Sequence, residues 1–279
     1  MNEIKRKKSL APGVTLLEIE APLIADKARP GNFLILRVNE KGERIPLTIA
    51  DYDRQAGTIT IIFQEVGYTT KLLGSLNEGE SLMDVAGPLG SHLEIKGYEK
   101  VVCVGGGSGV ALLYPEVKAF SRQDSEVITI TGARTRNLVI LEEELRELSE
   151  RLYVCTDDGS LGHEGFVTDV LQDILNEEQD IDLVVAIGPV VMMQAVAEMT
   201  EKKRIKTIVS LNSLMVDGTG MCGGCRVTVD GEVKFTCIDG PSFDAHKVDF
   251  DELSNRLSYY RDYEEMLADE DYKAGDSDE

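Results

Sequence analysis

Three of the five cysteines lie in one glycine-rich segment, which runs from Asp217 to Cys237 and reads DGTGMCGGCRVTVDGEVKFTC. Cys222 and Cys225 form a C-x2-C pair, and eleven residues separate Cys225 from Cys237. Those eleven residues alternate in hydrophobicity around an Asp-Gly dipeptide, a pattern that predicts a β-hairpin. Because a hairpin folds Cys237 back towards the pair, we expect three sulfurs to meet, which is typical of a metal centre.

Asp217 is the predicted fourth ligand. It lies where plant-type [2Fe–2S] sites, with their C-x4-C-x2-C spacing, have the first cysteine. A carboxylate can ligate iron through oxygen and carries the charge of a thiolate, but the harder donor should shift the cluster potential. The alternatives are a structural zinc site with His246 as fourth ligand and a loop without a cluster. Glycines around Cys222 favour [2Fe–2S], because backbone N–H groups near the sulfurs tune a redox centre.

A second glycine-rich turn follows the apolar strand of KVVCVGGGSGVALLYP and opens a predicted helix. Its residues are Gly105, Gly106, Gly107, Ser108 and Gly109. Glycine lets the backbone approach a phosphate, and the helix N-terminus offers free N–H groups and a positive dipole end. The spacing departs from G-x-G-x-x-G, and no Lys-Ser/Thr follows to make a triphosphate loop. The turn predicts a pyrophosphate site; the alternative is a tight structural turn.

Further candidates follow the later strands of the same predicted sheet. They are Gly132, Ala133, Arg134, Asp157, Asp158, Gly159, Gly188 and Pro189. Ligands of parallel sheets collect at the carboxyl ends of strands, so these residues should line one crevice with the glycine turn. Arg134 and Arg136 follow the second strand, where an acid favours NAD and an arginine accommodates NADP, so NADP(H) is not excluded beside NAD(H).

The elements that must position these residues fall into four parts. Residues 1–95 contain short β-rich runs, with one helical stretch near Thr69–Leu76, and predict an antiparallel β barrel. Residues 96–210 alternate apolar strands with helices and predict a Rossmann-like α/β domain with a parallel sheet. Residues 211–245 are too glycine-rich for a core of their own and predict a small module held by its metal centre. Residues 246–279 predict a C-terminal helix and an acidic tail.

The composition limits the possible partners and locations. The chain has 29 Lys and Arg against 50 Asp and Glu, a net charge of −21, which argues against a nucleic-acid partner. No apolar run reaches the ~20 residues of a membrane span, and no signal-peptide pattern appears, so we expect a cytoplasmic protein. Cys103 and Cys155 lie in valine-rich strands and are expected to be buried thiols. His92, His163 and His246 are expected to be structural.

Two stretches of the predicted barrel could hold a second dinucleotide. In ERIPLTIAD the candidate residues are Arg44, Pro46 and Thr48, and in EVGYTTKLL they are Gly67, Thr69 and Thr70. An arginine can bind a phosphate bidentately, and a glycine-threonine turn before a helix makes a second phosphate cradle. Together they suit a cofactor such as FAD.

The chain resembles the ferredoxin–NADP reductase superfamily in three features. These are an R-x-P-x-S/T strand in a small barrel, a GPLG junction at residues 87–90 and a glycine-rich α/β domain. The resemblance implies that Arg44 binds the FAD phosphates and that Gly67, Thr69 and Thr70 complete the pyrophosphate site. It also implies that the isoalloxazine ring lies along Pro46, Leu47, Thr48 and Ile49. Thr48, the candidate catalytic residue, would be a hydrogen-bond partner of the flavin rather than an acid or base.

Barrel, α/β domain and C-terminal [2Fe–2S] module in this order resemble two families of electron-transfer subunits across residues 1–265. One is the electron-transfer subunit of dihydroorotate dehydrogenase, which has cysteine at the first ligand position. The other is the small (alpha) subunit of NADH-dependent reduced ferredoxin:NADP oxidoreductase, of the sulfide dehydrogenase beta subunit type. That family has aspartate there, followed by GTGMCGGCRV as in this chain, so Asp217 favours it.

The second family implies an oxidoreductase subunit that moves electrons between NAD(H), FAD and a [2Fe–2S] cluster. Its implied partner is a larger subunit with FAD and [4Fe–4S] clusters, of the glutamate-synthase small-subunit type. The heterodimer would perform electron bifurcation, and ferredoxin would react through the complex. The alternatives are a dihydroorotate dehydrogenase subunit and a non-catalytic redox sensor on the same scaffold.

Overall fold

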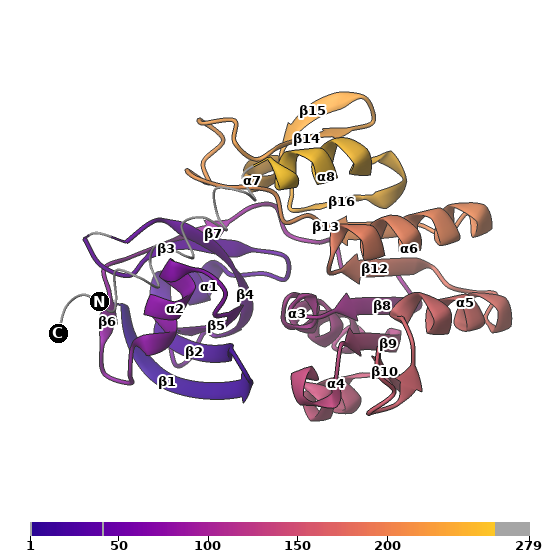
Figure 1. The fold of residues 1–279 in the computed structure, drawn as a ribbon, viewed down its shortest axis with the longest axis horizontal. Coiled ribbons are helices and arrows are strands. Elements are labelled where there is room, and N and C mark those ends of the chain that lie inside the picture. The colour runs from indigo at the N-terminus through magenta and orange to yellow at the C-terminus, as the bar shows by residue number, and fades with distance from the viewer. Residues whose placement is uncertain (1, 41, 260–279) are drawn as a thin grey trace.

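The structure is a computed structural model and describes residues 2–40 and 42–259. Within these ranges the chain forms two large sheets and one two-stranded hairpin (Figure 1). The acidic tail predicted at the C-terminal end lies, from residue 260 onward, outside the described residues. In the part of the chain that is described, no helix has the length and apolar character needed to cross a membrane.

The N-terminal sheet is a nearly closed antiparallel barrel of seven strands in the order β6-β1-β2-β5-β4-β3-β7. The strands are β1 (Asn2–Ala11), β2 (Val14–Glu20), β3 (Phe33–Arg37), β4 (Ile45–Asp53), β5 (Thr58–Gln64), β6 (Ser81–Leu82) and β7 (Asp84–Leu89). Helix α2 (Tyr68–Ser75) confirms the helical stretch predicted from sequence. Helix α1 (Pro22–Lys27) was not predicted, because six residues are too few to show a helical period.

The second sheet has seven strands in the order β11-β10-β9-β8-β12-β13-β16, and only its edge strand β16 is antiparallel. The strands are β8 (Lys100–Gly106), β9 (Glu126–Ala133), β10 (Arg151–Thr156), β11 (His163–Glu164), β12 (Leu183–Ile187), β13 (Thr207–Ser210) and β16 (Ser242–Asp244). The helices between them are α3 (Gly109–Ser121), η1 (Arg136–Leu138), α4 (Glu142–Leu148), α5 (Val167–Glu177) and α6 (Val190–Lys203). The predicted strand–helix alternation is thus confirmed.

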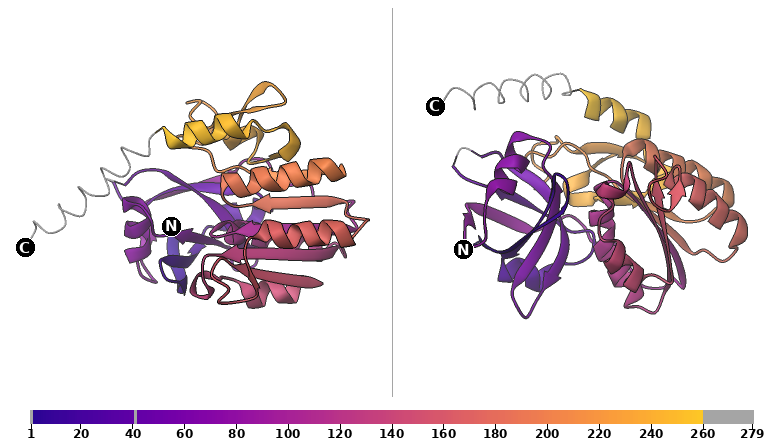
Figure 2. Two further views of the ribbon diagram at one scale, coloured as in Figure 1. Left: turned by 45° about the vertical axis from the view of Figure 1, so that its right-hand side comes forward. Right: turned by 60° about the horizontal axis from the view of Figure 1, so that its bottom comes forward.

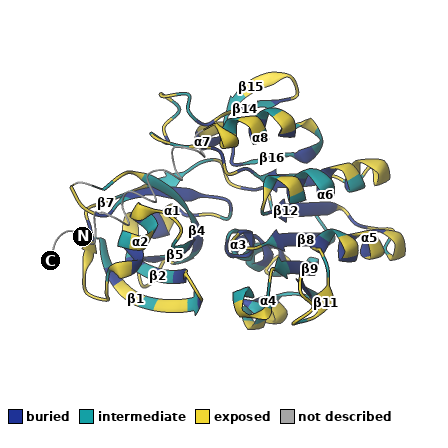
Figure 3. Ribbon diagram, in the orientation of Figure 1, coloured by how far each residue is buried: buried dark blue, intermediate teal, exposed yellow. Residues whose placement is uncertain are grey.

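The central strands of this sheet are buried, as Figure 3 shows for β8, β9 and β12. One apolar cluster packs α5 and α6 against one face, and a second packs α3 and α4 against the other. Continuous apolar strands such as Val101–Val104 are what burial on both faces requires. Cys103 and Cys155 are both fully buried here, as predicted.

Residues after β13 form a hairpin and a short helical end. Strands β14 (Arg226–Val229) and β15 (Glu232–Phe235) confirm the predicted hairpin, and Asp230 and Gly231 turn it with φ of +56° and +73°. Helices α7 (Thr236–Asp239), η2 (Ala245–Lys247) and α8 (Phe250–Ser258) follow. The strand β16, although it lies within residues 211–245, pairs with β13, so this segment also contributes to the α/β sheet.

The barrel and the α/β domain meet along α3 and β4. Lys118 Nζ lies 2.6 Å from Asp51 Oδ2, and the barrel residues Val14 and Ala50 belong to the same apolar cluster as the inner face of α3. In Figures 1 and 2 the loop before β14 reaches from the end of the α/β domain to the barrel. The barrel therefore contacts both the helix that follows the glycine turn and the cysteine segment.

Candidate functional site

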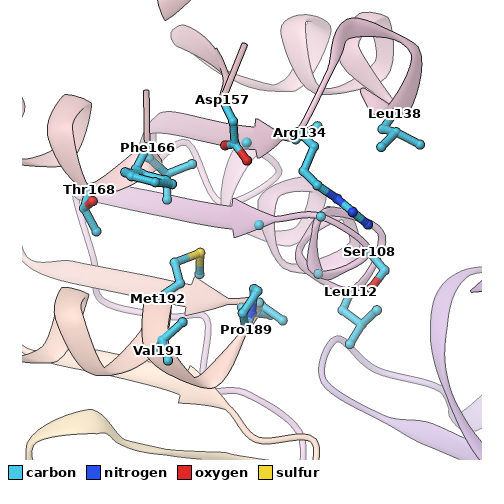
Figure 4. Close-up of a pocket in the computed structure, with 18 of the residues that line it drawn as sticks. Ser108, Leu112, Arg134, Leu138, Asp157, Phe166, Thr168, Pro189, Val191 and Met192 are labelled. Atoms are coloured by element: carbon cyan, nitrogen blue, oxygen red, sulfur yellow. The ribbon is translucent and has the colours of Figure 1, made fainter. Parts of the chain in front are cut away.

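A cavity of about 640 Å³ opens at the carboxyl ends of the parallel strands (Figure 4). Four residues of the glycine turn line it, namely Gly106, Gly107, Ser108 and Gly109. The predicted residues Gly132, Ala133, Arg134, Asp157, Gly188 and Pro189 line it as well. Gly105, Asp158 and Gly159 are not among its lining residues. The crevice expected from the sequence is therefore formed by most, but not all, of its candidates.

The glycines of the turn have distinct roles. Gly107 has a φ of +56°, and no atom lies within 4 Å of the place a Cβ would take, so a ligand can approach its backbone. A Cβ on Gly109 would lie 2.3 Å from the Ile187 carbonyl oxygen, and one on Gly106 would lie 2.6 Å from Met192 Sδ. Gly109 thus lets α3 pack against the end of β12, and Gly106 lets α6 pack against the end of β8, while Gly107 leaves space for a phosphate.

Ser108 is the N-cap of the thirteen-residue helix α3, and its side chain makes no capping hydrogen bond. The positive dipole end of α3 thus faces the cavity beside a hydroxyl group, while the N–H groups of Val110 and Ala111 donate to the carbonyls of Gly107 and Ser108. In Figure 4 the Arg134 side chain extends from the end of β9 towards Ser108. This arrangement of donors fits the pyrophosphate of a dinucleotide.

The two aspartates after β10 differ in position. Asp157 lines the cavity, whereas Asp158 accepts hydrogen bonds from the backbone N–H and hydroxyl group of Ser160 at 3.0 and 2.5 Å. Those bonds lower the pKa of the Asp158 carboxyl, and the bond from the Ser160 hydroxyl group has the larger effect. Asp158 therefore stabilises the loop, whereas Asp157 is the acid that lines the cavity.

Sequence reasoning missed several apolar residues of the cavity. Phe166 and Val191 line it with exposures of 65% and 74%, which leaves apolar surface open to a planar base. Val14 and Gln64 come from the barrel, where they are paired neighbours on β2 and β5. Apolar residues in strands and helix starts carry no signal that distinguishes a pocket wall from a core. The barrel origin of two residues shows that the cavity faces the predicted flavin domain.

In the barrel, β4 holds the predicted flavin residues in register with β3. Ile35 is opposite Pro46, Leu34 is opposite Leu47, and Phe33 is opposite Thr48. Leu47 and Ile49 point into the barrel core, and Ile49 is fully buried there. Pro46 and Thr48, which alternate with them, face outward and are half-buried. Pro46 and Thr48 can therefore contact a flat ring with their side chains, whereas Ile49 offers only its backbone.

The second predicted cradle lies at the start of α2. Gly67 is its N-cap, and no atom lies within 4 Å of the place a Cβ would take, so this backbone is open to a phosphate. The Thr70 hydroxyl accepts the backbone N–H groups of Gly67 and Val66 at 3.0 and 3.1 Å. Thr69 is buried, with its hydroxyl 3.5 Å from Glu43 Oε2. The glycine thus fits the predicted pyrophosphate, while both threonine hydroxyls already have protein partners.

The three cysteines of the predicted cluster site differ in how far they are buried. Cys225 and Cys237 are each 2% exposed, and the Cys237 N–H lies 3.5 Å from Cys225 Sγ. Burial, and then the adjacent Cys225 thiol, raise the pKa of Cys237 to about 12. Cys222 is exposed, and the N–H groups of Gly224 and Asp217, in that order, lower its pKa. A bound iron would deprotonate such thiols outright.

The Asp217 carboxylate lies on the Cys222 side of this site. It accepts hydrogen bonds from the hydroxyl group and the backbone N–H of Thr219, the latter at 3.1 Å. Those bonds lower the pKa of Asp217, with a smaller contribution from the positive charge of Arg44. The four candidate ligands thus form two pairs, Asp217 with Cys222 and Cys225 with Cys237.

Two pairs fit a binuclear cluster, in which four protein ligands are shared between two irons. Within residues 2–40 and 42–259, no three His, Cys, Asp or Glu side chains are grouped closely enough to hold one metal ion. His246, the ligand of the zinc alternative, lies against α6 with Nε2 3.0 Å from Thr200 Oγ1. The geometry therefore does not favour the zinc alternative.

Two family models match the chain. The model described as the iron-sulfur cluster binding domain of dihydroorotate dehydrogenase B matches residues 212–249, and the oxidoreductase NAD-binding domain matches residues 103–198. The first range contains the four candidate ligands, and the second contains the glycine turn. Both matches agree with the prediction of an iron–sulfur module after a nicotinamide-nucleotide domain.

Relatives and solved structures extend the similarity to the whole chain. The homologue of the dihydroorotate dehydrogenase B (NAD(+)) electron transfer subunit from Thermotoga maritima is 45% identical over 266 residues, covering 95% of this chain and 94% of the relative. The electron transfer subunit from Fusobacterium nucleatum is 30% identical over 257 residues, covering 89% and 97%. A chain of the NADH-dependent reduced ferredoxin-NADP oxidoreductase structure, reported for flavin-based electron bifurcation, superposes with a TM-score of 0.92 at 44% identity and 98% coverage of both chains.

A more distant match is the cytochrome P450 reductase GcoB of Amycolatopsis, with a TM-score of 0.62 at 21% identity, covering 73% of this chain and 66% of that one. At that identity it shows the fold alone, which is the fold that the ferredoxin–NADP reductase resemblance predicted. The close relatives match from the barrel to the cysteine segment. This chain therefore belongs to the family of oxidoreductase electron-transfer subunits that includes the electron transfer subunit of dihydroorotate dehydrogenase B.

Proposed function

We propose that this chain carries electrons between NAD(H), FAD and a [2Fe–2S] cluster, as a subunit of a heteromeric, electron-bifurcating NADH-dependent ferredoxin:NADP oxidoreductase. The observation that supports this most is that one barrel borders all three sites. Val14 and Gln64 line the nucleotide cavity, β4 carries the flavin candidates, and Phe33 and Ile35 pack with Cys225 and Cys237. When bound, FAD exchanges a hydride with NAD(H), and the cluster moves single electrons.

The residues of the chain position these groups. Gly107 and Ser108 at the start of α3 bind the pyrophosphate of the nucleotide, and Asp157 meets the adenosine ribose. Arg44 and Gly67 bind the FAD phosphates, and the outward face of Pro46 and Thr48 supports the ring.

At the cluster, Asp217 and Cys222 would hold one iron, and Cys225 and Cys237 would hold the other. The N–H group of Gly224, 3.5 Å from Cys222 Sγ, stabilises the negative charge at that sulfur.

The proposed partner is a larger subunit with FAD and [4Fe–4S] clusters, of the glutamate-synthase small-subunit type, in the cytoplasm. The 44% identity to a chain of the bifurcating complex supports this choice. An electron-transfer subunit of dihydroorotate dehydrogenase is the second candidate, supported by the family model of residues 212–249. A redox sensor on the same scaffold would bind FAD and the cluster but oxidise NADH negligibly.

The test is anaerobic purification of the chain with its natural partner, followed by absorption and EPR spectra before and after addition of NADH. We expect bleaching of the flavin, an EPR signal of a reduced [2Fe–2S] cluster, and a partner with [4Fe–4S] clusters. The isolated chain should oxidise NADH with an artificial acceptor but should not reduce ferredoxin with NADPH. Unaided reduction of ferredoxin by NADPH would contradict the subunit proposal, and co-purification of a dihydroorotate-oxidising partner would support the second candidate.

A further inference from the structure

The loop that carries Asp217 and Cys222 is packed against the outer face of the barrel. Phe33 and Ile35 of β3 form one buried cluster with Cys225 and Cys237, and no member of it is more than 5% exposed. Leu89 of β7, together with Met215 and Phe235, borders the same cluster. The barrel thus supplies part of the hydrophobic core that this loop lacks.

Gly218, the residue after Asp217, makes the closest approach to this face. It has a φ of +76° and is buried. A Cβ at this position would lie 2.2 Å from Ile35 Cδ1, 3.2 Å from Ile35 Cγ1 and 3.4 Å from Leu89 Cδ1. Ile35 is itself 5% exposed, so its side chain has little room to move away. The backbone of the ligand loop therefore rests directly on the Ile35 side chain.

Ile35 also adjoins the strand that carries the flavin candidates. It is the cross-strand partner of Pro46, and paired residues of neighbouring antiparallel strands project on the same face. The face of Pro46 and Thr48 is therefore continuous with the face on which Gly218 rests. The candidate ligand loop thus rests on the strand next to the candidate flavin strand.

We propose that Gly218 is a positioning residue, which together with Ile35 sets the gap between flavin and cluster; this inference rests on the proposed function. A hydride from NADH brings two electrons and a proton to FAD. One electron then passes across the gap to a ferric iron of the cluster, which becomes ferrous, while the flavin proton goes to solvent. The second electron follows after the first has left for an external one-electron acceptor. Because electron tunnelling weakens steeply with distance, a larger gap slows this step and leaves hydride transfer unchanged.

The test compares Gly218→Ala with Gly231→Ala in the full chain loaded with FAD and cluster. Gly231 has a similar φ of +73° but no atom within 4 Å of its Cβ position, so this control variant has the same backbone strain without the contact. After anaerobic mixing with NADH, flavin bleaching and cluster reduction are followed separately by stopped-flow absorption and freeze-quench EPR. We expect Gly218→Ala to slow cluster reduction several-fold and to leave flavin bleaching at the wild-type rate. Gly231→Ala should leave both rates unchanged.

A second variant tests the steric cause. Ile35→Val removes Cδ1, the atom that the new methyl group would meet, so Gly218→Ala combined with Ile35→Val should recover the rate of cluster reduction. Iron and sulfide contents and the EPR line shape after dithionite reduction should match the wild type in every variant. Three outcomes would overturn the proposal. The rate of cluster reduction could be unchanged in Gly218→Ala, or Gly231→Ala could slow it equally. Gly218→Ala could also lose its cluster without recovering it when combined with Ile35→Val. Failure of the wild-type cluster to accept electrons from NADH would instead overturn the proposed function.

Discussion

The nucleotide cavity lies on a sheet buried on both faces, whereas residues 211–225 of the cysteine segment contain no helix or strand. The walls of the cavity are strand ends and helix starts fixed by those two apolar clusters. The cysteine loop is held by the hairpin after it, by the barrel face beneath it and, as proposed, by its cluster. From this difference we expect the cavity to form without a ligand and the folding of the loop to be coupled to metal binding.

The largest effect should come from removing a buried cluster ligand. Cys225→Ala is expected to abolish the visible absorption and EPR signal of the cluster. With Cys225 removed, one of the two irons keeps only a single protein ligand. NADH affinity, measured by equilibrium titration, should stay within twofold of the wild type, since the cavity has its own core. Cys155→Ala, at a fully buried thiol of the α/β sheet, is the control and should retain the cluster. Loss of NADH binding in Cys225→Ala would show that the two regions fold as one unit.

A second substitution alters the nucleotide cavity and leaves the cluster ligands in place. Gly109→Ala places a methyl group 2.3 Å from the Ile187 carbonyl oxygen, and backbone on both sides cannot yield without moving α3. We expect the free energy of unfolding to fall by about 1–3 kcal/mol and NADH binding to weaken, with no change in the EPR spectrum of the cluster. Calorimetry and NADH titration measure these effects. Gly97→Ala, which meets no atom within 4 Å, should keep the wild-type NADH affinity.

A buried acid on α3 gives the α/β domain a pH dependence. Glu116 is 1% exposed, its Oε2 has no hydrogen-bond partner among the described residues, and burial raises its pKa from 4.5 to about 8. Between these values the folded state keeps a proton that the unfolded state releases, so the free energy of unfolding falls as pH rises. The slope approaches about 1.4 kcal/mol per pH unit. Denaturant titrations at pH 5.5 and 7.5 should show the wild-type decline and a flatter profile for Glu116→Gln; equal slopes would contradict this account.

The smallest expected change concerns the unusual ligand. Asp217→Cys should retain the cluster, because a thiolate has the same charge as the carboxylate, but should alter its EPR g-values and potential. Asp217→Ala should disturb the cluster further. EPR spectroscopy with redox titration measures both. If Asp217→Ala leaves the spectrum untouched, the fourth ligand is another residue.

Much of this arrangement follows from local patterns in the sequence. Apolar runs and glycines predicted the parallel strands, and the Asp-Gly dipeptide at 230–231 predicted the hairpin. Contacts between distant segments could not be predicted in this way. The placement of Gln64 in the nucleotide cavity and of Ile35 beneath Gly218 depends on how the barrel packs, which no short pattern encodes. Likewise, Asp158 resembled a pocket residue in the sequence, but its hydrogen bonds to Ser160 assign it to the loop.

The pairing of β16 with β13 has a consequence for how the chain is made. Val209 pairs with Phe243, so the edge of the α/β sheet stays open until more than thirty further residues have left the ribosome. An open strand edge can pair with another chain, and domains form in N- to C-terminal order during synthesis. A chain truncated before Ser242 should therefore aggregate through β13, even with its barrel and nucleotide cavity complete.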